Sequence, residues 1–238
     1  MPGVWLVLPT YNEADNLEPL VRSVLSQLDG TGLPYTVLVV DDDSPDGTGQ
    51  VGDRLAAETD RVQVLHRAHK QGLGRAYVAG FEVALEAGAD LIIEMDADFS
   101  HDPADVPRLI AAADAADLVL GSRYVPGGGV ASWGVARRIV SRAGCAYARL
   151  VLGIPVRDLT GGFKCFNRRV LEALDLTGVH ANGYGFQIEL TYKAVRAGFT
   201  VTEVPIVFRE RRQGASKMTP PIALEAVWKV IALRLRAR

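Results

Sequence analysis

The sequence predicts an α/β fold in which a mostly parallel β-sheet is flanked by helices. Short apolar runs of strand length recur through the first half of the chain, and a stretch with helical spacing follows nearly every run. The runs are rich in Val, Ile and Leu on both faces, which is typical of parallel strands buried between two layers of helices. The chain has 238 residues, 48% of them hydrophobic, which is enough for one large domain with its own core.

The predicted elements follow one another in a regular order. Predicted strands cover residues 4–8, 35–40, 62–65, 91–95, 117–120 and 200–208. A predicted helix carries apolar residues with helical spacing from Leu17 to Leu28, and a second helical stretch contains Val51 and Leu55. Further predicted helices run from the Gly72–Gly74 loop to about Ala87, over residues 103–113 and over about 136–152. A helix-forming run follows Phe163, and Gly183–Glu189 opens a further helix. The alternation breaks at the glycines of residues 127–129, so the second half is expected to differ from the first.

Polar clusters follow several predicted strands at their carboxyl ends. They are Pro9–Glu13, Asp41–Thr48, Asp96–His101 and Ser122–Tyr124. In a sheet of parallel strands these ends meet at one edge, which is where such sheets bind ligands. Several polar clusters at one edge favour a nucleotide or phosphate site over a set of solvated loops. A dinucleotide fold fits poorly, because no Gly-x-Gly-x-x-Gly follows the first strand.

The run Leu91–Pro103 contains the strongest candidate for a metal site. Its apolar part predicts a buried strand, and the carboxylates of Asp96 and Asp98 follow it. If the backbone stays extended there, the two side chains project to the same side and can share one cation. Mg²⁺ or Mn²⁺ suits such a pair, because these ions bind one or two carboxylates together with substrate phosphates. Taken alone, an Asp-x-Asp motif is more often a solvated acidic loop.

The net charge of −2 hides a strong asymmetry along the chain. Residues 1–110 carry 7 Lys and Arg against 19 Asp and Glu, whereas residues 111–195 carry 10 against 6 and residues 196–238 carry 9 against 3. An acidic first half suits a metal, and a basic second half suits phosphates or an anionic membrane surface. Two differently charged solvated faces explain the same counts. No nucleic-acid partner is expected.

The cysteines, histidines and apolar runs argue against a C-x-x-C redox or zinc protein, and against a protein with a signal peptide or a membrane span. Cys145 and Cys165 form no C-x-x-C pair and are expected to be reduced, buried thiols of a cytosolic protein. The four histidines lack ligand spacing, so no zinc site is expected. The apolar run Val4–Leu8 is too short for a signal peptide, and no run reaches the ~18 apolar residues of a membrane span.

Two basic stretches of the second half are open to more than one interpretation. Arg138 and Arg142 are four residues apart and share a helix face, where they would either clamp a phosphate or belong to a solvated surface. Residues 221–238 place apolar side chains on one helical face beside basic ones. That pattern suits an interfacial helix on anionic lipid, and it equally suits a helix packed on the catalytic domain or on a membrane partner.

Taken together and in order, these motifs resemble the family 2 glycosyltransferases, most of all the polyprenyl-phosphate (dolichyl-phosphate) mannose synthases. The residues that carry the resemblance are Pro9–Glu13, Asp41–Thr48, Gly72–Gly74, Met95–His101, Gly121–Tyr124, Ser141–Arg142, Asp158–Phe163, Gly185–Gln187 and Gly214–Lys217. They span nearly the whole chain. The resemblance implies a nucleotide-diphospho-sugar transferase (GT-A-like) fold. It also implies a catalytic domain at residues 1–218, with a donor-binding half at 1–125 and an acceptor-side half at 126–218, before a basic amphipathic helix at 219–238.

The resemblance also implies roles for individual residues. Nucleotide binding is assigned to Pro9, Tyr11, Glu13, Val40, Asp42, Asp96 and Ala97. Metal binding is assigned to Asp96, Asp98 and Ser100, the last standing where some relatives carry a glutamine ligand. Catalysis is assigned to Asp96, Asp98, Arg123, Arg211 and Lys217, and binding of the acceptor phosphate to Arg123, Arg138, Ser141 and Arg142.

The implied reaction is an inverting, metal-dependent transfer of mannose from GDP-mannose to a polyprenyl phosphate, on the cytoplasmic face of a membrane. Related enzymes that act on hydroxyls often place a carboxylate base before a late helix, where this chain has Gln187-Ile188-Glu189. A lipid phosphate, with a second pKa of about 6, is already largely dianionic at neutral pH and needs no base. Direct displacement with inversion is therefore expected.

Three alternatives share part of this pattern. A UDP-glucose-dependent polyprenyl-phosphate glucosyltransferase would carry the same early motifs. A nucleotide-sugar-binding module would bind the nucleotide without turnover. Asp96–Ser100 loosely resembles the nucleophile motif of haloacid-dehalogenase-like phosphatases, although that motif should follow the first strand and here three strands precede it.

Overall fold

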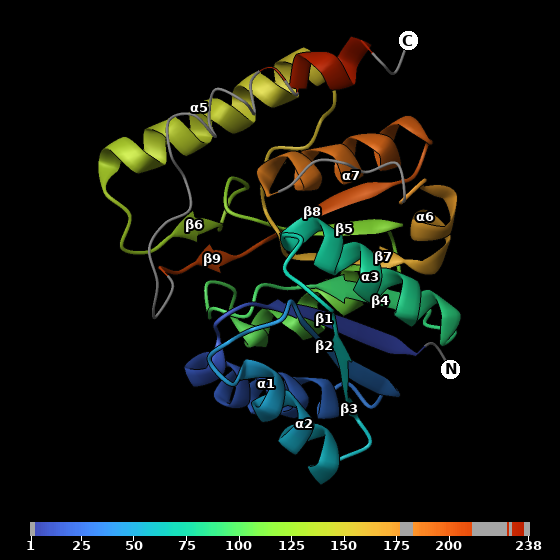
Figure 1. Ribbon diagram of the computed structural model, residues 1–238. Helices are drawn as coiled ribbons and strands as arrows, with labels where there is room; N and C mark the ends of the chain where they lie inside the picture. Colours follow the sequence, from blue (N-terminus) through green and yellow to red (C-terminus); the bar gives the residue numbers. More distant parts are fainter. Residues whose placement is uncertain (1–2, 177–182, 211–227, 229, 236–238) are drawn as a thin grey trace.

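The computed structural model describes residues 3–176, 183–210, 228 and 230–235, and its centre is a seven-stranded sheet (Figure 1). The strand order is β3-β2-β1-β4-β7-β5-β8. These strands are β1 (Val4–Thr10), β2 (Tyr35–Asp41), β3 (Val62–His66), β4 (Leu91–Glu94), β5 (Leu118–Ser122), β7 (Lys164–Asn167) and β8 (Val201–Pro205). The helices are α1 (Ala14–Asp29), α2 (Thr48–Glu58), α3 (Leu73–Glu86), α4 (Val106–Ala112), α5 (Val135–Leu152), α6 (Arg168–Ala173) and α7 (Tyr184–Arg196), with a 3-10 turn η1 (Pro103–Asp105) before α4.

The prediction of a mostly parallel sheet is confirmed. Among the described strands of this sheet, β7 alone runs antiparallel to its neighbours, β4 and β5. The sequence pattern predicts no strand here and favours a helix-forming run after Phe163. That expectation was wrong for Lys164–Asn167, because this segment of only four residues is stabilised by pairing with distant strands rather than by its local pattern.

The order of the strands creates a switch point between β1 and β4. From β1 the chain moves outward through β2 and β3, and it then returns to place β4 on the opposite side of β1. Ligands of open α/β sheets bind beyond the carboxyl ends of the strands at such a point. The loops that follow β1 and β4 carry Tyr11, Glu13, Asp96 and Asp98, so the topology puts the predicted donor residues at this position.

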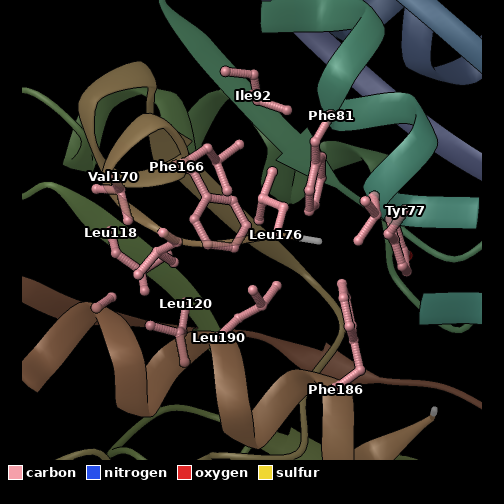
Figure 2. Packing of buried hydrophobic residues seen from close by; sticks show 14 of the residues in the cluster. Tyr77, Phe81, Ile92, Leu118, Leu120, Phe166, Val170, Leu176, Phe186 and Leu190 are labelled. Carbon is pink, nitrogen blue, oxygen red and sulfur yellow. The ribbon is translucent and has the colours of Figure 1, made fainter. Parts of the chain in front are cut away.

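Helices cover both faces of the sheet with separate apolar cores. On one face, α1 buries Leu17, Leu20 and Val24 beside residues of α4. On the other face, α3 and α7 meet over β7, where the rings of Tyr77 and Phe186 stack with their centroids 5.9 Å apart (Figure 2). Helix α3 lies close to the sheet at Gly80, where a β-carbon would come within 2.4 Å of a methyl group of β1. Both cores therefore pack against β1 and β4, the strands that flank the switch point.

Helix α5 lies at the edge of the molecule, beyond a small parallel sheet of β6 (Gly129–Val130) and β9 (Val207–Phe208) (Figure 1). It buries small or C-terminal side chains such as Cys145 and Ala148 and leaves Ile139, Val140 and Leu150 exposed. The helical residues 230–235 pack against its end, because Arg234 Nη1 donates to the Leu152 carbonyl at 3.2 Å. Within the described part of the chain, none of the helices has both the length and the apolar character needed to cross a bilayer.

Several boundaries differ from the predicted ones. Strands β1, β2 and β5 extend to Thr10, Asp41 and Ser122, so the polar clusters begin inside the strands. The predicted final strand is divided into β8 and β9, and the predicted helix after Pro103 begins as the turn η1. Both cysteines are buried and free, as expected.

Candidate active site

The loops that follow β1, β2 and β4 each contain a non-glycine residue with a left-handed backbone. These residues are Asn12, Asp43 and Phe99, with φ angles of 60°, 61° and 61°. Such conformations are strained by about 1–3 kcal/mol each and persist only where surrounding contacts hold them. Strain of this kind at the ends of three adjacent strands marks the edge beside the switch point as a candidate active site.

The residues predicted to bind the nucleoside lie together at this edge. Pro9 and Val40 are buried neighbours in the ladder between β1 and β2. Tyr11 follows β1, and the ammonium of Lys70 lies 3.4 Å from the centre of its ring. Glu13 begins helix α1, and its backbone N–H donates to Thr48 Oγ1 at 2.9 Å. The structure thus gathers these residues from loops that are distant in sequence.

Asp42 organises the loop that carries Lys70. Its buried carboxylate accepts from the backbone N–H groups of Gln71, at 3.0 Å, and Gly72, at 3.1 Å, and forms an ion pair with Arg67. These contacts tie the loop before α3 to the end of β2. Contact between Asp42 and a nucleoside stays a prediction.

The Asp96–Asp98 segment is held in place by individual hydrogen bonds. Strand β4 ends at Glu94 and the chain bends from Ala97 onward, so the extended backbone that we expected to align the two carboxylates is absent. Instead, Tyr77 Oη donates to Asp96 Oδ1 at 3.0 Å, and the Ser100 N–H donates to Asp98 Oδ1 at 3.0 Å. The backbone turn, rather than the period of a strand, sets the direction of each side chain.

His101 belongs to the candidate site, although the sequence did not predict it. Its ring is buried against Phe163, with centroids 5.0 Å apart, and its Nδ1 accepts from the Asp96 N–H at 3.3 Å. Burial lowers the pKa of His101 to about 4, so the ring is neutral near pH 7 and able to accept this bond. Its signal in the sequence was its place within the acidic loop, although it has no metal-ligand spacing.

A second missed cluster lies directly behind Asp96. Lys164 and Glu94 face one another across β7 and β4, both fully buried, with 2.9 Å between Nζ and Oε1. Burial raises the pKa of Glu94 and lowers that of Lys164, and each charge opposes the effect on the other. Lys164 Nζ also donates to the side-chain oxygen of Gln187 on α7. A lysine within the otherwise apolar run Phe163–Phe166 was the available signal.

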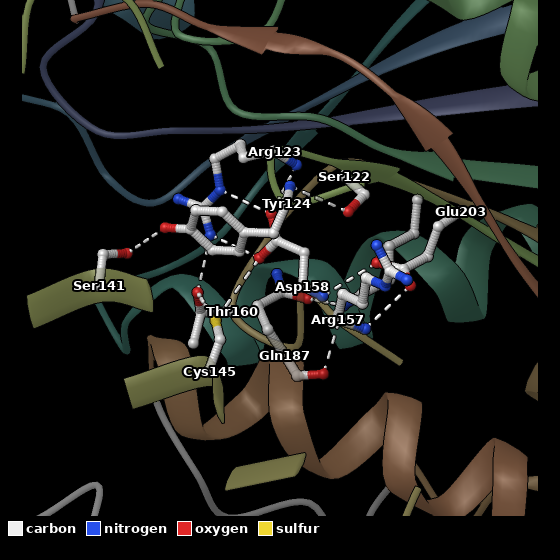
Figure 3. A network of polar contacts seen from close by, with 11 residues as sticks. Ser122, Arg123, Tyr124, Ser141, Cys145, Arg157, Asp158, Thr160, Gln187 and Glu203 are labelled. Carbon is white, nitrogen blue, oxygen red and sulfur yellow. Dashed lines mark hydrogen bonds and ion pairs between the residues drawn. The ribbon is translucent and has the colours of Figure 1, made fainter. Parts of the chain in front are cut away.

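Arg123 lies at the end of β5 in a buried ion pair with Asp158 (Figure 3). Its Nε donates to Asp158 Oδ2 at 2.7 Å, and its Nη2 donates to Oδ1 at 2.6 Å and to Thr160 Oγ1 at 2.7 Å. Although burial acts in the opposite direction, Arg123 holds the pKa of Asp158 below its usual range. Asp158, for which the sequence predicted no role of its own, therefore fixes the guanidinium of Arg123.

The predicted acceptor residues of α5 lie next to this ion pair. Tyr124, the neighbour of Arg123, donates from its hydroxyl to Ser141 Oγ at 2.6 Å, and the Arg142 guanidinium is 5.7 Å from the Tyr124 ring centre. Arg138 donates from Nε to the Trp133 carbonyl at 3.1 Å. The structure therefore places Ser141 and Arg142 beside Tyr124, the neighbour of Arg123 in the chain, and turns Arg138 toward the start of the helix.

Two of the predicted catalytic residues, Arg211 and Lys217, lie outside the described residues. The described chain reaches the acidic loop at Arg209, whose N–H donates to the Ser100 carbonyl at 3.0 Å. The roles of Arg211 and Lys217 stay predictions.

The sequence matches a known family model, that of glycosyl transferase family 2, over residues 5–175. The chain belongs to this family. Membership identifies it as a glycosyltransferase and excludes the phosphatase alternative. Two curated relatives align over nearly the whole of this glycosyltransferase. The polyprenol monophosphomannose synthase of Mycolicibacterium smegmatis is 47% identical over 236 residues, which are 98% of this chain and 87% of the relative. The undecaprenyl-phosphate mannosyltransferase of Micrococcus luteus is 47% identical over 235 residues, which are 99% of this chain and 95% of the relative.

Solved structures support the fold of this glycosyltransferase. The glucosyl-3-phosphoglycerate synthase of Mycobacterium tuberculosis, in complex with Mn²⁺ and UDP-glucose, matches with a TM-score of 0.69 at 21% identity, covering 99% of this chain and 79% of that one. The same enzyme in complex with phosphoglyceric acid matches with a TM-score of 0.68 at 23% identity, covering 99% and 80%. The likeness confirms the GT-A-like fold.

The residues at the acidic loop fit a hard divalent cation. Asp96 and Asp98 offer carboxylate oxygens, and Ser100 Oγ is buried without a hydrogen-bond partner among the described residues. No group of three or more His, Cys, Asp and Glu side chains in the described ranges could hold an ion by itself. Two carboxylates and a hydroxyl leave positions open for water and substrate phosphates, which is the arrangement that Mg²⁺ and Mn²⁺ prefer.

Proposed function

We propose that this glycosyltransferase transfers mannose from GDP-mannose to a polyprenyl (dolichyl-type) phosphate, with inversion, to give polyprenyl-phosphate β-mannose and GDP. The observation that carries the proposal is the 47% identity to two relatives named for lipid-phosphate mannose transfer, over nearly the full length of each chain. The arrangement of the described site supports both halves of this reaction.

The donor half supplies groups suited to a nucleoside diphosphate. Asp96, Asp98 and Ser100 would hold Mg²⁺ or Mn²⁺, which would offset the negative charge that develops on the departing diphosphate. Tyr77 and Ser100 orient the two carboxylates through their hydrogen bonds, and neutral His101 holds the backbone of Asp96. The loops after β1 and β2, joined by Asp42 to the loop that carries Lys70, would receive the nucleoside.

The described residues of the acceptor half supply cations and present no obvious base. Arg123 is locked by Asp158, and Ser141 and Arg142 lie beside Tyr124, its neighbour in the chain, so a phosphate could meet hydroxyl and guanidinium donors there. Gln187 occupies the position at which transferases acting on hydroxyls often carry a carboxylate. A phosphate dianion attacks without losing a proton, which makes a neutral amide at this position compatible with the reaction.

Helix α5 gives the proposed enzyme a surface suited to its lipid acceptor. Ile139, Val140 and Leu150 are 62%, 60% and 81% exposed, and the helix carries four arginines and no carboxylate. An apolar face with basic flanks favours binding to an anionic membrane surface. The C-terminal residues 228 and 230–235 differ from α5 in part, because Val230 is buried on the domain while Trp228 and Leu235 are exposed. We therefore infer peripheral membrane association through α5, with the segment 230–235 packed on the domain.

A transfer assay tests the proposal. The protein is given radiolabelled GDP-mannose or UDP-glucose, each with a short polyprenyl phosphate and Mg²⁺ or Mn²⁺, and label in the organic-extractable lipid is counted. A chelator and the variant Asp98→Ala serve as controls.

Metal-dependent labelling from GDP-mannose alone is the expected result. Labelling from UDP-glucose alone would mean that the donor is UDP-glucose rather than GDP-mannose, with a lipid phosphate still as the acceptor. An absence of lipid labelling from either donor, despite nucleotide binding, would overturn the proposal. An α-linked product from the α-linked donor would overturn the inversion.

A further inference from the structure

Tyr124 joins the end of β5 to helix α5 through its phenol group. Its Oη lies 2.6 Å from Ser141 Oγ, which is a short hydrogen bond between two hydroxyls (Figure 3). Tyr124 directly follows Arg123, and Ser141 lies near the middle of α5. Both residues are half-buried rather than enclosed in the core. The bond therefore connects the sheet to the helix that carries the predicted acceptor residues.

The hydroxyl of Ser141 keeps its own proton for another partner. A phenol is a stronger acid than an aliphatic alcohol, so Tyr124 donates and Ser141 Oγ accepts. The single O–H of Ser141 is then not used in this bond. A serine within a helix otherwise tends to turn its hydroxyl toward the carbonyl of the preceding turn. The bond from Tyr124 holds Oγ toward the end of β5 instead.

The ring of Tyr124 also gathers two guanidinium groups. That of Arg123 lies 5.1 Å from the ring centre, and that of Arg142 lies 5.7 Å from it. Both distances are within the range of a cation–π contact, in which the negative face of the ring attracts a cation. Two like charges repel one another, and this attraction offsets part of the repulsion. Tyr124 thus brings a hydroxyl donor and two cations around one side chain.

A phosphate monoester matches these groups. Its oxygens accept several hydrogen bonds and carry up to two negative charges, which suits hydroxyl and guanidinium donors. Helix α5 contains no carboxylate that would repel it, and Asp158 is already paired with Arg123. The donor diphosphate has its own proposed position at the acidic loop after β4. The cluster around Tyr124 is therefore left for the phosphate of the acceptor.

We propose that Tyr124 is a positioning residue for the acceptor. Its phenol orients the hydroxyl of Ser141, and its ring holds Arg142 near Arg123, so that these groups together receive the phosphate of the polyprenyl phosphate. The inference rests on the proposed function, and it deepens that function by naming the residue through which β5 sets the acceptor site on α5.

Steady-state kinetics with GDP-mannose and a short polyprenyl phosphate separate the acceptor from the donor. Tyr124→Phe keeps the ring and removes the phenol hydroxyl. We expect it to raise the KM for the polyprenyl phosphate about tenfold, because one hydrogen bond to a charged group loses its orientation, and to leave the KM for GDP-mannose unchanged. The matched control is Tyr35→Phe, which loses a phenol hydrogen bond of 2.7 Å to Asp29 at the start of β2, the end of the strand opposite the candidate site. It should change neither KM.

A double-variant cycle tests whether the phenol acts through Ser141. Ser141→Ala should also raise the KM for the polyprenyl phosphate about tenfold. Adding Tyr124→Phe to Ser141→Ala should then change this KM by less than about twofold, because no hydroxyl is left to orient. Tyr124→Leu removes the ring as well, and we expect it to raise the KM about threefold further than Tyr124→Phe does. That further rise should disappear when Arg142→Gln is present.

Four results would overturn the inference. They are an unchanged KM for the polyprenyl phosphate in Tyr124→Phe, an equal rise in the KM values of both substrates, independent effects of Tyr124→Phe and Ser141→Ala in the double variant, and a wild type that does not bind the polyprenyl phosphate. Failure of the proposed function is a separate result, because calorimetric binding of the polyprenyl phosphate needs no transfer. If the wild type transfers from UDP-glucose or does not transfer at all, the same variants are compared by that binding, and the same fold-changes decide the inference.

Discussion

Helices α1 and α5 have similar lengths, 16 and 18 residues, and similar amphipathic patterns, yet they bury very different side chains. In α1 the large apolar residues, such as Leu17 and Leu20, are fully buried between the sheet and its neighbours. In α5 the large apolar residues, such as Ile139 and Leu150, are exposed, and the buried side is made largely of small residues. An apolar stripe predicts a helix, but it does not say whether the stripe meets a core or another surface. The apolar side of α1 completes a core within the chain, whereas α5 leaves large apolar side chains exposed.

The largest effect that we expect concerns the acidic loop after β4. Asp98→Ala removes one of two carboxylates from the candidate metal site, and we expect transfer to fall by about 1,000-fold, or about 4 kcal/mol. Initial rates of mannose transfer measure the effect, with Asp60→Ala at an exposed position as the control. If Asp98→Ala has activity close to that of the wild type, the acidic loop takes no part in the transfer reaction.

A pair of matched substitutions tests the difference between the two helices. Leu20→Ala in α1 removes a fully buried side chain and should lower the free energy of unfolding by about 2–5 kcal/mol. Leu150→Ala in α5 removes a side chain that is 81% exposed and should change it by less than about 0.5 kcal/mol. Urea unfolding of both variants gives the comparison. Equal losses would mean that α5 is packed as firmly as α1.

The exposed face of α5 should bind lipid. Ile139→Asn removes apolar surface, and we expect about tenfold weaker binding to anionic vesicles without a change in thermal stability. Co-sedimentation with vesicles measures the affinity, and Ala57→Asn on the exposed side of α2 is the control. Unchanged co-sedimentation of Ile139→Asn with the vesicles would show that this face of α5 does not bind the membrane.

The smallest effect concerns the inner side of α5. Cys145 on this helix and Cys165 in β7 are both buried, and burial raises the pKa of Cys165 to about 12. Because a thiolate is the reactive form, neither thiol should react with a thiol reagent at pH 8 within minutes. Both should react once the chain is unfolded in urea. Rapid labelling of native Cys145 would show that α5 does not stay packed on the domain.

Local sequence signals predicted the first half of the chain well and the described part of the second half poorly. The strands and polar loops of the first half could be predicted because each strand and the helix after it carry their own period. Strand β7 could not, because Lys164 is stabilised by Glu94, which is 70 residues away in the sequence. The orientation of α5 could not be predicted either. Its apolar stripe fits a helix that buries this stripe in the core and equally fits a helix that exposes it.

The candidate site shows the same division. The polar residues after β1, β2 and β4 were predicted, because parallel strands bring their carboxyl ends to one edge. The hydrogen bond from Asp96 to His101, the ion pair of Arg123 with Asp158, and the contact between Lys164 and Gln187 were missed. Each of these contacts depends on a turn or on a pairing between distant segments, for which one sequence carries no local signal.

One measurement addresses the central proposal, that this glycosyltransferase transfers mannose at a membrane surface to which α5 binds. Transfer from GDP-mannose is followed with a short, water-soluble polyprenyl phosphate and with a long one in anionic vesicles, for the wild type and the double variant Ile139→Asn, Leu150→Asn. We expect the wild type to use both acceptors, and the double variant to keep its rate on the soluble acceptor while losing about 100-fold on the vesicles. No transfer by the wild type to either acceptor, or equal rates of the double variant and the wild type on the vesicles, would contradict the claim.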